Sequence, residues 1–122
     1  MKVNFVTILK ARMEESIRFY TEVMGFEVAR DFAAAPGRRI VFLANGPGTM
    51  IELIADEGVT ERASGDISIG FHVDDIEATE GLMRENGVEI TAGPYSVPSG
   101  VKLMSVLDPN GVTLGFVQEP PR

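Results

Sequence analysis

The stretch Met24-Gly25-Phe26-Glu27-Val28 returns later in the chain as Asn86-Gly87-Val88-Glu89-Ile90. Each copy has a glycine where a helix can end, because glycine adopts the required left-handed conformation most easily. Alternating apolar and charged residues follow that glycine, which is typical of a strand. The chain therefore contains one pattern twice, at an interval of about 60 residues, which is too long for a solenoid repeat and indicates a duplicated module.

A second pair of matching stretches supports the duplication. Asn45-Gly46-Pro47-Gly48 precedes an apolar run at 49–55, and Asp108-Pro109-Asn110-Gly111 precedes another at 112–118. Both tetrapeptides consist of residues that favour turns. Each half then has the order strand, helix, strand, strand, strand. We therefore expect an α+β fold built of two tandem βαβββ modules.

In the first half, hydrophobic periodicity predicts strands at 3–9, 26–30, 39–44 and 49–55, with a loop at 31–37. An apolar stripe predicts a helix over 13–24. The members of this stripe are Met13, Ile17, Tyr20 and Met24.

In the second half, the pattern predicts strands at 67–73, 88–90, 101–107 and 112–118, with a loop at 93–100. A helix over 74–86 is expected to begin at Asp74 or Asp75, since aspartate caps helix N-termini. Its apolar members are Ile76, Leu82 and Met83. One domain, 1–122, would comprise module one at 1–55, a linker at 56–66, module two at 67–118 and a tail at 119–122.

The composition narrows the range of functions. The 122 residues include no cysteine and one histidine, which excludes disulfides, thiolate nucleophiles and a metal centre of several histidines within one chain. A net charge of −7 argues against nucleic acid as a partner, since phosphate binding needs a positive surface, and it favours cationic ligands. No apolar run is long enough for a membrane helix, and no signal peptide is evident. We expect a cytoplasmic protein with no membrane partner.

Two motifs resemble those of a known superfamily. The segment 15–28, ESIRFYTEVMGFEV, resembles the first-helix signature of the vicinal-oxygen-chelate superfamily, which includes glyoxalase I, extradiol dioxygenases and the bleomycin-resistance proteins. The segment 107–111, LDPNG, followed by a strand, is similar to the last β-hairpin of that superfamily. The resemblance implies the glyoxalase/bleomycin-resistance fold, with curved half-barrel sheets. It also implies a homodimer, in which modules of both subunits often build the ligand-binding cups.

Metal-dependent members of this superfamily hold a divalent ion with four side chains. The resemblance puts those positions at Phe5, Glu52, Ser68 and Gly115. Only Glu52 offers an ordinary ligand, whereas an ion needs three or four at fixed geometry. Leu9 falls where glyoxalase I has an arginine that contacts glutathione. We therefore expect no metal and no other cofactor.

Glu52 and His72 are the candidate catalytic residues. Glu52 lies within an apolar strand, so it is either paired with an arginine or water, or it is a ligand anchor or a general base whose pKa burial raises. His72 shares a strand face with Ser68 and Gly70 by alternation. It is either hydrogen-bonded to a loop at the strand end, or it is a ligand or an acid–base group. His72 lies roughly 13 Å from Ser68, at about 3.3 Å per residue, so it is too far away to share an ion with Glu52 if Glu52 is level with Ser68.

Alternation along the strands predicts an apolar cup with few polar groups, as expected for a small-molecule site. The ligand-binding residues that we expect are Phe5, Thr7, Leu9, Met50, Glu52, Ser68, His72, Met104 and Gly115. The loops at 31–39 and 93–100 are candidate lids, with Phe32 and Tyr95 as aromatic contacts.

Three functions remain open. The first is a metal-independent protein of the bleomycin-resistance type that holds an apolar or cationic small molecule. The second is a glyoxalase-like lyase or isomerase that uses Glu52, with or without His72, although no ion would stabilise an enediolate. The third is a homodimeric regulatory module without a ligand.

Overall fold

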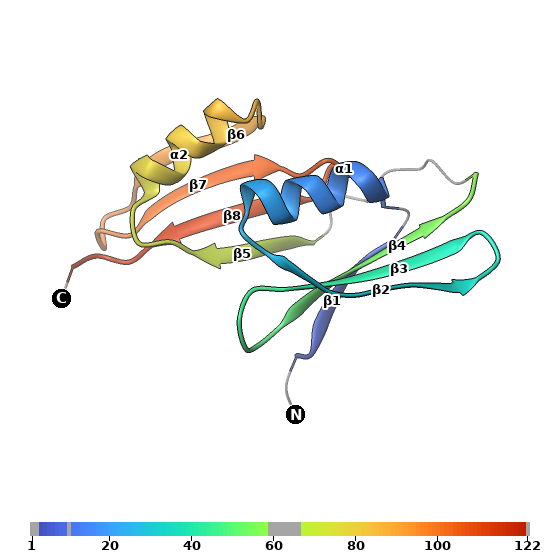
Figure 1. Ribbon diagram of the computed structural model, residues 1–122. Coiled ribbons are helices and arrows are strands. Elements are labelled where there is room, and N and C mark those ends of the chain that lie inside the picture. Colours follow the sequence, from blue (N-terminus) through green and yellow to red (C-terminus); the bar gives the residue numbers. More distant parts are fainter. Residues whose placement is uncertain (1–2, 10, 59–66, 122) are drawn as a thin grey trace. The chain divides into compact units, whose positions relative to one another are not determined.

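Residues 3–9, 11–58 and 67–121 are described by the computed structural model. The chain forms two compact units, Met1–Ala63 and Ser64–Arg122. Figure 1 shows the first unit in blue to green and the second in yellow-green to red. In its described residues, each unit contains a four-stranded sheet and a helical segment.

The first unit has the predicted order of elements. They are β1 (Phe5–Ile8), α1 (Met13–Arg18), the π-helical segment η1 (Phe19–Val23), β2 (Glu27–Ala35), β3 (Arg38–Ala44) and β4 (Met50–Asp56). The strand order in the sheet is β1-β4-β3-β2, and among these neighbours only β1 and β4 run parallel. A parallel pair of strands needs a long crossover connection. Here the helical segment and the β2–β3 hairpin form that connection between β1 and β4.

The second unit repeats this plan. Its elements are β5 (Ser68–His72), α2 (Ile76–Glu85), β6 (Ile90–Ser96), β7 (Lys102–Leu107) and β8 (Thr113–Gln118). The strand order is β5-β8-β7-β6, and again only the first pair in this order is parallel. Both sheets therefore have the same topology, which confirms the α+β fold of two tandem βαβββ modules.

One face of each sheet is buried and lies toward the helical segment of the same unit. α1 contacts β4, η1 contacts β2, and α2 contacts β6, β7 and β8. The buried residues on this covered face are Val41, Leu43, Ile51 and Leu53 in the first sheet, and Met104, Val106, Leu114 and Phe116 in the second. Because strand residues alternate between faces, the residues between these lie on the other side of each sheet, here called the open face.

Two segments that the sequence pattern predicts as loops are wholly or partly strand. The expectation of a loop at 31–37 is wrong, because β2 continues to Ala35 in pairing with β3. The chain turns at Gly37, whose φ of +75° is the left-handed conformation that glycine favours. Part of the expected loop at 93–100 belongs to β6, which extends to Ser96. The first candidate lid is therefore a hairpin, and part of the second is a strand.

The first helix is present, but its buried stripe differs from the predicted one. Met13, Ile17 and Met24 are only half-buried. The buried residues are Ser16, Phe19, Tyr20 and Val23. In η1, the Met24 N–H donates to the Phe19 carbonyl, five residues earlier, at 3.0 Å. This wider turn changes the direction of the side chains in its second half.

The structure shows which of the two candidate aspartates, Asp74 or Asp75, caps the second helix, α2. Asp75 is the N-cap, and its Oδ1 accepts a hydrogen bond of 3.1 Å from the Ala78 N–H. Ile76 and Met83 are buried as predicted, whereas Leu82 is 40% exposed.

Among the helices in the described ranges, none is long and apolar enough to cross a membrane. The cytoplasmic location stays a prediction. Residues 59–66 of the predicted linker lie outside the described residues.

Candidate functional site

Each strand of the first sheet contributes one residue to a single row on the open face. Thr7 of β1 pairs with Glu52 of β4, Glu52 pairs with Phe42 of β3, and Phe42 pairs with Arg30 of β2. Neighbouring strands lie about 4.8 Å apart. A hydroxyl, a carboxylate, an aromatic ring and a guanidinium therefore follow one another across the sheet.

Glu52 is a nearly buried carboxylate with a hydroxyl partner. It is 9% exposed, and its Oε1 accepts a hydrogen bond of 2.6 Å from the Thr7 hydroxyl. No arginine or lysine within the described ranges forms an ion pair with it, so the arginine partner considered from the sequence is not present there. A carboxylate has about four lone-pair sites. Glu52 therefore keeps the capacity to accept hydrogen bonds from a ligand.

Three phenylalanines and one arginine lie together beside Glu52, and we call Phe5, Phe32, Phe42 and Arg30 the aromatic patch. The rings of Phe5 and Phe42 meet edge to face, with centroids 5.4 Å apart. The Arg30 Cζ lies 4.7 Å from the Phe32 ring centroid and 5.8 Å from that of Phe42. Both distances are within the range of cation–π interactions. Phe5 is 43% exposed and Arg30 is exposed, so the patch is accessible.

The open face of the second sheet has a different character. Ser68, Gly70 and His72 lie on it, as alternation predicts, and Gly70 pairs with Gly115 of β8. The His72 Nε2 lies 3.4 Å from an Asp74 carboxylate oxygen, and the histidine side chain is 62% exposed. This contact agrees with the interpretation of His72 as a strand-end residue held by a loop. Its acid–base role stays a prediction.

Met104 lies on the covered face of the second sheet. It pairs with Phe116 and is 1% exposed, whereas its neighbour Ser105 pairs with Gly115. The prediction that Met104 lines the same face as Gly115 is therefore wrong. Alternation along β7 gives that position to Ser105.

The positions that the resemblance assigns to a metal ion do not fit one. Phenylalanine and glycine at positions 5 and 115 have no donor side chain, and Ser68 is a poor ligand when neutral. Glu52 is the one anionic ligand of the four positions. Within the described part of either unit, no three His, Asp or Glu side chains come together as a metal site. The donor chemistry therefore does not support a divalent centre of the superfamily type.

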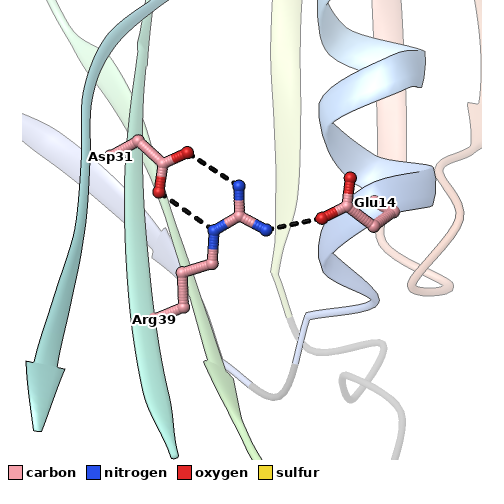
Figure 2. A network of polar contacts seen from close by, with 3 residues as sticks. All are labelled: Glu14, Asp31 and Arg39. Atoms are coloured by element: carbon pink, nitrogen blue, oxygen red, sulfur yellow. Dashed lines mark hydrogen bonds and ion pairs between the residues drawn. The ribbon is translucent and has the colours of Figure 1, made fainter.

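On the covered side of the first sheet, Arg39 joins the β2–β3 hairpin to α1, as Figure 2 shows. Its Nε and Nη2 donate to the two Asp31 oxygens at 2.9 and 2.7 Å, and its Nη1 donates to Glu14. The hydrogen bond from Arg39 holds the pKa of Asp31 below its ordinary value. The bonds to Asp31 and Glu14 raise the pKa of Arg39. This network holds the strand that also carries Arg30 and Phe32.

The sequence patterns missed two members of the aromatic patch, Arg30 and Phe42. Phe42 could be found from alternation, since its neighbours Val41 and Leu43 belong to the covered face. The side taken by Arg30 depends on an irregularity in β2 for which the sequence has no clear signal. Phe32 is present in the patch as part of a strand rather than of a lid.

An open hollow of about 440 Å³ lies at the start of β1. Its lining residues are Val3, Asn4, Gly48 and Thr49. None of the predicted site residues lines it, so the open face of the first sheet is the stronger candidate site.

Comparison with known proteins gives matches that span nearly the whole chain. The family model described as Glyoxalase/Bleomycin resistance protein/Dioxygenase superfamily matches residues 2–116. Over 115 residues the chain is 34% identical to a probable lactoylglutathione lyase of Vibrio cholerae, which covers 87% of this chain and 82% of that protein.

Solved structures share the fold. The structure of a trypanothione-dependent glyoxalase I from Leishmania major matches with a TM-score of 0.82 at 29% identity, over 98% of this chain and 87% of that one. TnmS3, an antibiotic-binding protein from Streptomyces sp. CB03234, matches with a TM-score of 0.75 at 22% identity, over 99% and 97% of the two chains. At that identity the second likeness shows the fold alone. Because one fold can host different functions, the activity has to be argued from the site. The chain belongs to the Glyoxalase/Bleomycin resistance protein/Dioxygenase superfamily.

Proposed function

We propose that this chain binds a small organic molecule on the open face of its first sheet, without a metal ion. The supporting observation is the row in which the nearly buried Glu52, with one hydroxyl donor, lies next to Phe42, which in turn lies next to Arg30. Such a surface combines apolar area with a few placed polar groups, which is the usual composition of a small-molecule site. Four predicted ligand-binding residues belong to this face: Phe5, Thr7, Met50 and Glu52.

Further ligand contacts are proposed at Leu9, Ser68, His72 and Gly115. Leu9 is 55% exposed just beyond β1, and the other three lie on the open face of the second sheet. Met104 is not included, because its side chain is buried on the covered face.

A lyase is a second candidate function, favoured by the 34% identity to the probable lactoylglutathione lyase. In this function Glu52 would be the general base and His72 a further acid–base group. Proton abstraction also requires a group that stabilises the developing enediolate. The positions that would hold a metal ion for this task lack the ligands, which is why we rank the lyase second.

Metal analysis and a lyase assay on the purified chain separate these functions. After exposure to nickel, zinc and iron, we expect far less than one ion per chain and no formation of lactoylglutathione above background. Stoichiometric metal that is lost in Glu52→Gln but kept in Glu27→Gln would support the lyase instead. Glu27 is a suitable control because it is an exposed glutamate of the same unit.

Binding itself is tested by thermal-shift and calorimetric titration against apolar and charged aromatic compounds. We expect ligands that bind the unaltered chain and bind Phe42→Ala more weakly. The control is Leu82→Ala, which removes an exposed apolar side chain from α2. Failure of the whole panel to bind would favour the ligand-free regulatory module.

We also propose a homodimer, which the superfamily resemblance implies. Exposed apolar residues support the proposal, among them Val3 at 68% and Ile67 at 71% exposure. Analytical ultracentrifugation at micromolar concentration tests it, and a single species with the mass of one chain would contradict it.

A further inference from the structure

We propose that the aromatic patch selects a planar aromatic molecule with one acidic group, and that Arg30 binds the acid. This inference rests on the function proposed above, since it names the ligand class of the same surface. Three observations support it: the side of the sheet on which Arg30 lies, the absence of a carboxylate partner for Arg30 within the described residues, and the position of its guanidinium within cation–π distance of two rings.

A β-bulge puts Arg30 on the open face. Val28 pairs with Leu43, but the next pair is Arg30 with Phe42, so Ala29 is an extra residue in β2. Regular pairing would put Ala29 opposite Phe42 and would turn Arg30 to the covered face. Bulges often re-aim a side chain beside an active or binding site. Here the bulge directs an arginine toward phenylalanine rings.

Arg30 differs from the other described cations in its partners. The ion pairs of those cations are Arg12–Glu15, Arg18–Glu22, Arg38–Asp56, Arg39–Asp31, Arg84–Glu80 and Lys102–Glu77. Within residues 3–9, 11–58 and 67–121, no carboxylate forms an ion pair with Arg30. The chain has 18 acidic and 11 basic residues, so a shortage of carboxylates does not explain this difference. The charge of Arg30 is therefore available to an anion from outside the chain.

The phenylalanine rings position the guanidinium without using its hydrogen-bond donors. Its Cζ lies 4.7 Å from the Phe32 centroid and 5.8 Å from the Phe42 centroid. A guanidinium has five N–H donors at the edge of its plane, and no carboxylate of the described residues occupies those of Arg30. The edge can bind a carboxylate through two parallel hydrogen bonds. The Arg30 guanidinium is therefore already positioned to bind the carboxylate of a planar acid.

The aromatic part of the ligand follows from the neighbouring rings. Phe5 and Phe42 meet at an interplanar angle of 83°, and Phe5 is 43% exposed. This leaves apolar area on which a flat ring can pack. Glu52 lies two strands away from Arg30 in the same row, about 10 Å at ordinary strand spacing. Its carboxylate disfavours a second acidic group, so we expect one acid per ligand.

The net charge of −7 favours a cationic ligand. At the aromatic patch, this overall charge has less influence than the nearby charge of Arg30. Charges on other parts of the surface are screened beyond about 8 Å at physiological ionic strength. A group seated on the patch contacts Arg30 directly. The local cation therefore determines the class of ligand more strongly than the overall charge.

The test compares three probes that share one ring system: 2-naphthoate, 2-naphthamide and naphthalen-2-ylmethylammonium. The chain has no tryptophan, so naphthalene fluorescence can be followed without overlap from indole. We expect naphthoate to bind severalfold more tightly than the amide, because only the carboxylate can accept two parallel charge-assisted hydrogen bonds from the exposed guanidinium. The ammonium compound should bind most weakly.

Substitutions test whether Arg30 causes the preference for naphthoate over the amide. In Arg30→Gln, the naphthoate affinity should fall to that of the amide, and Arg30→Lys should give an intermediate affinity because it keeps the charge but not the planar edge. The control is Arg38→Gln, which removes an open-face arginine that pairs with Asp56. It should leave the ratio of the naphthoate and amide affinities unchanged. Circular dichroism verifies that each variant is folded.

The outcomes distinguish this inference from the proposed function. Equal binding of naphthoate and amide, or tighter binding of the ammonium compound, would overturn the acidic class while leaving small-molecule binding intact. An equal loss in Arg30→Gln and Arg38→Gln would show a general charge effect and would overturn the role of Arg30. If none of the three probes binds, the aromatic-acid class is wrong, and the wider compound panel decides the binding function.

Discussion

Thr7 and Glu52 form the polar centre of the candidate site, and their hydrogen bond can be measured as a stability effect. Removing the donor in Thr7→Val leaves a nearly buried carboxylate oxygen without its 2.6 Å partner. We expect a loss of about 1 kcal/mol in the free energy of unfolding, measured in urea. In a Glu52→Gln background the same change should cost less, because an unpaired amide is less costly to bury than an unpaired carboxylate. Equal costs in the two backgrounds would show that the two side chains are not coupled.

Asp31 makes stability depend on pH in the acidic range. Its hydrogen bond with Arg39 holds its pKa below the ordinary 3.8 in the folded chain. The stabilisation is complete above pH 3.8 and is lost as the pH falls through the lower folded value. The unfolding free energy of the unaltered chain should therefore fall more steeply below about pH 4 than that of Asp31→Asn. Because both side chains are more than a third exposed, the difference should stay below about 1 kcal/mol.

Glu89→Gln provides the control for the acid titration, because it removes an exposed carboxylate from the second unit. Its unfolding free energy should follow that of the unaltered chain through the acidic range. Parallel curves for all three proteins would contradict the assignment to Asp31.

The sequence predicts single residues well where regular alternation determines their side of the sheet. Thr7 and Met50 were found in this way from Phe5 and Glu52, whose positions follow from the family resemblance, and β1 and β4 do pair in continuous register. Arg30 could not be found, because the bulge at Ala29 reverses the side of Arg30 and of the following residues as far as Ala33. The residue types at 28–30 do not predict such a bulge.

At the scale of elements, the start of α2 provides a test with a matched pair of aspartates. Asp75 accepts a hydrogen bond from the Ala78 N–H, and Gln118 Oε1 accepts one of 2.7 Å from the Ile76 N–H. Asp75→Ala should lower the free energy of unfolding by about 1 kcal/mol, with Gln118 still bonded to the helix. Asp74→Ala, at a highly exposed neighbour, should change it by less than about 0.5 kcal/mol. Urea denaturation measures both, and equal effects would contradict the capping assignment.

The β2–β3 hairpin shows which elements the sequence could not delimit. The observed turn lies at Pro36 and Gly37, inside the predicted loop, and the alanines at 33–35 lack the alternation that identifies a strand. Pairing with β3 and the ion pair between Asp31 and Arg39 hold this segment in the sheet, with one irregularity between Ala33 and Ala35. The elements with strong periodicity, such as β4, β8 and α2, were predicted within a few residues of their observed ends.

At the scale of the molecule, the duplication explains both what was predicted and how the two units differ. Matching positions occupy matching strands, so the fold could be derived from the repeated pattern. The open faces have diverged: Glu52 of β4 lies in a row with Phe42 and Arg30, whereas its counterpart in β8, Gly115, pairs with Gly70 and Ser105. The first sheet therefore has a carboxylate at this position of the row, while the second has a glycine without a side chain.

The two units each contain roughly half of the chain, and their size predicts how they unfold. A domain of about 60 residues buries only about 60% of its unfolded surface and is marginal by itself. We therefore expect both units to unfold in one cooperative transition. The two tyrosines report on them separately, since Tyr20 lies in the first unit and Tyr95 in the second. In the variant Tyr95→Phe, the remaining fluorescence comes from Tyr20, and in Tyr20→Phe it comes from Tyr95. In each variant, the urea midpoint of this fluorescence should equal the midpoint measured by far-UV circular dichroism. Separate midpoints within one variant would show that each unit is stable alone.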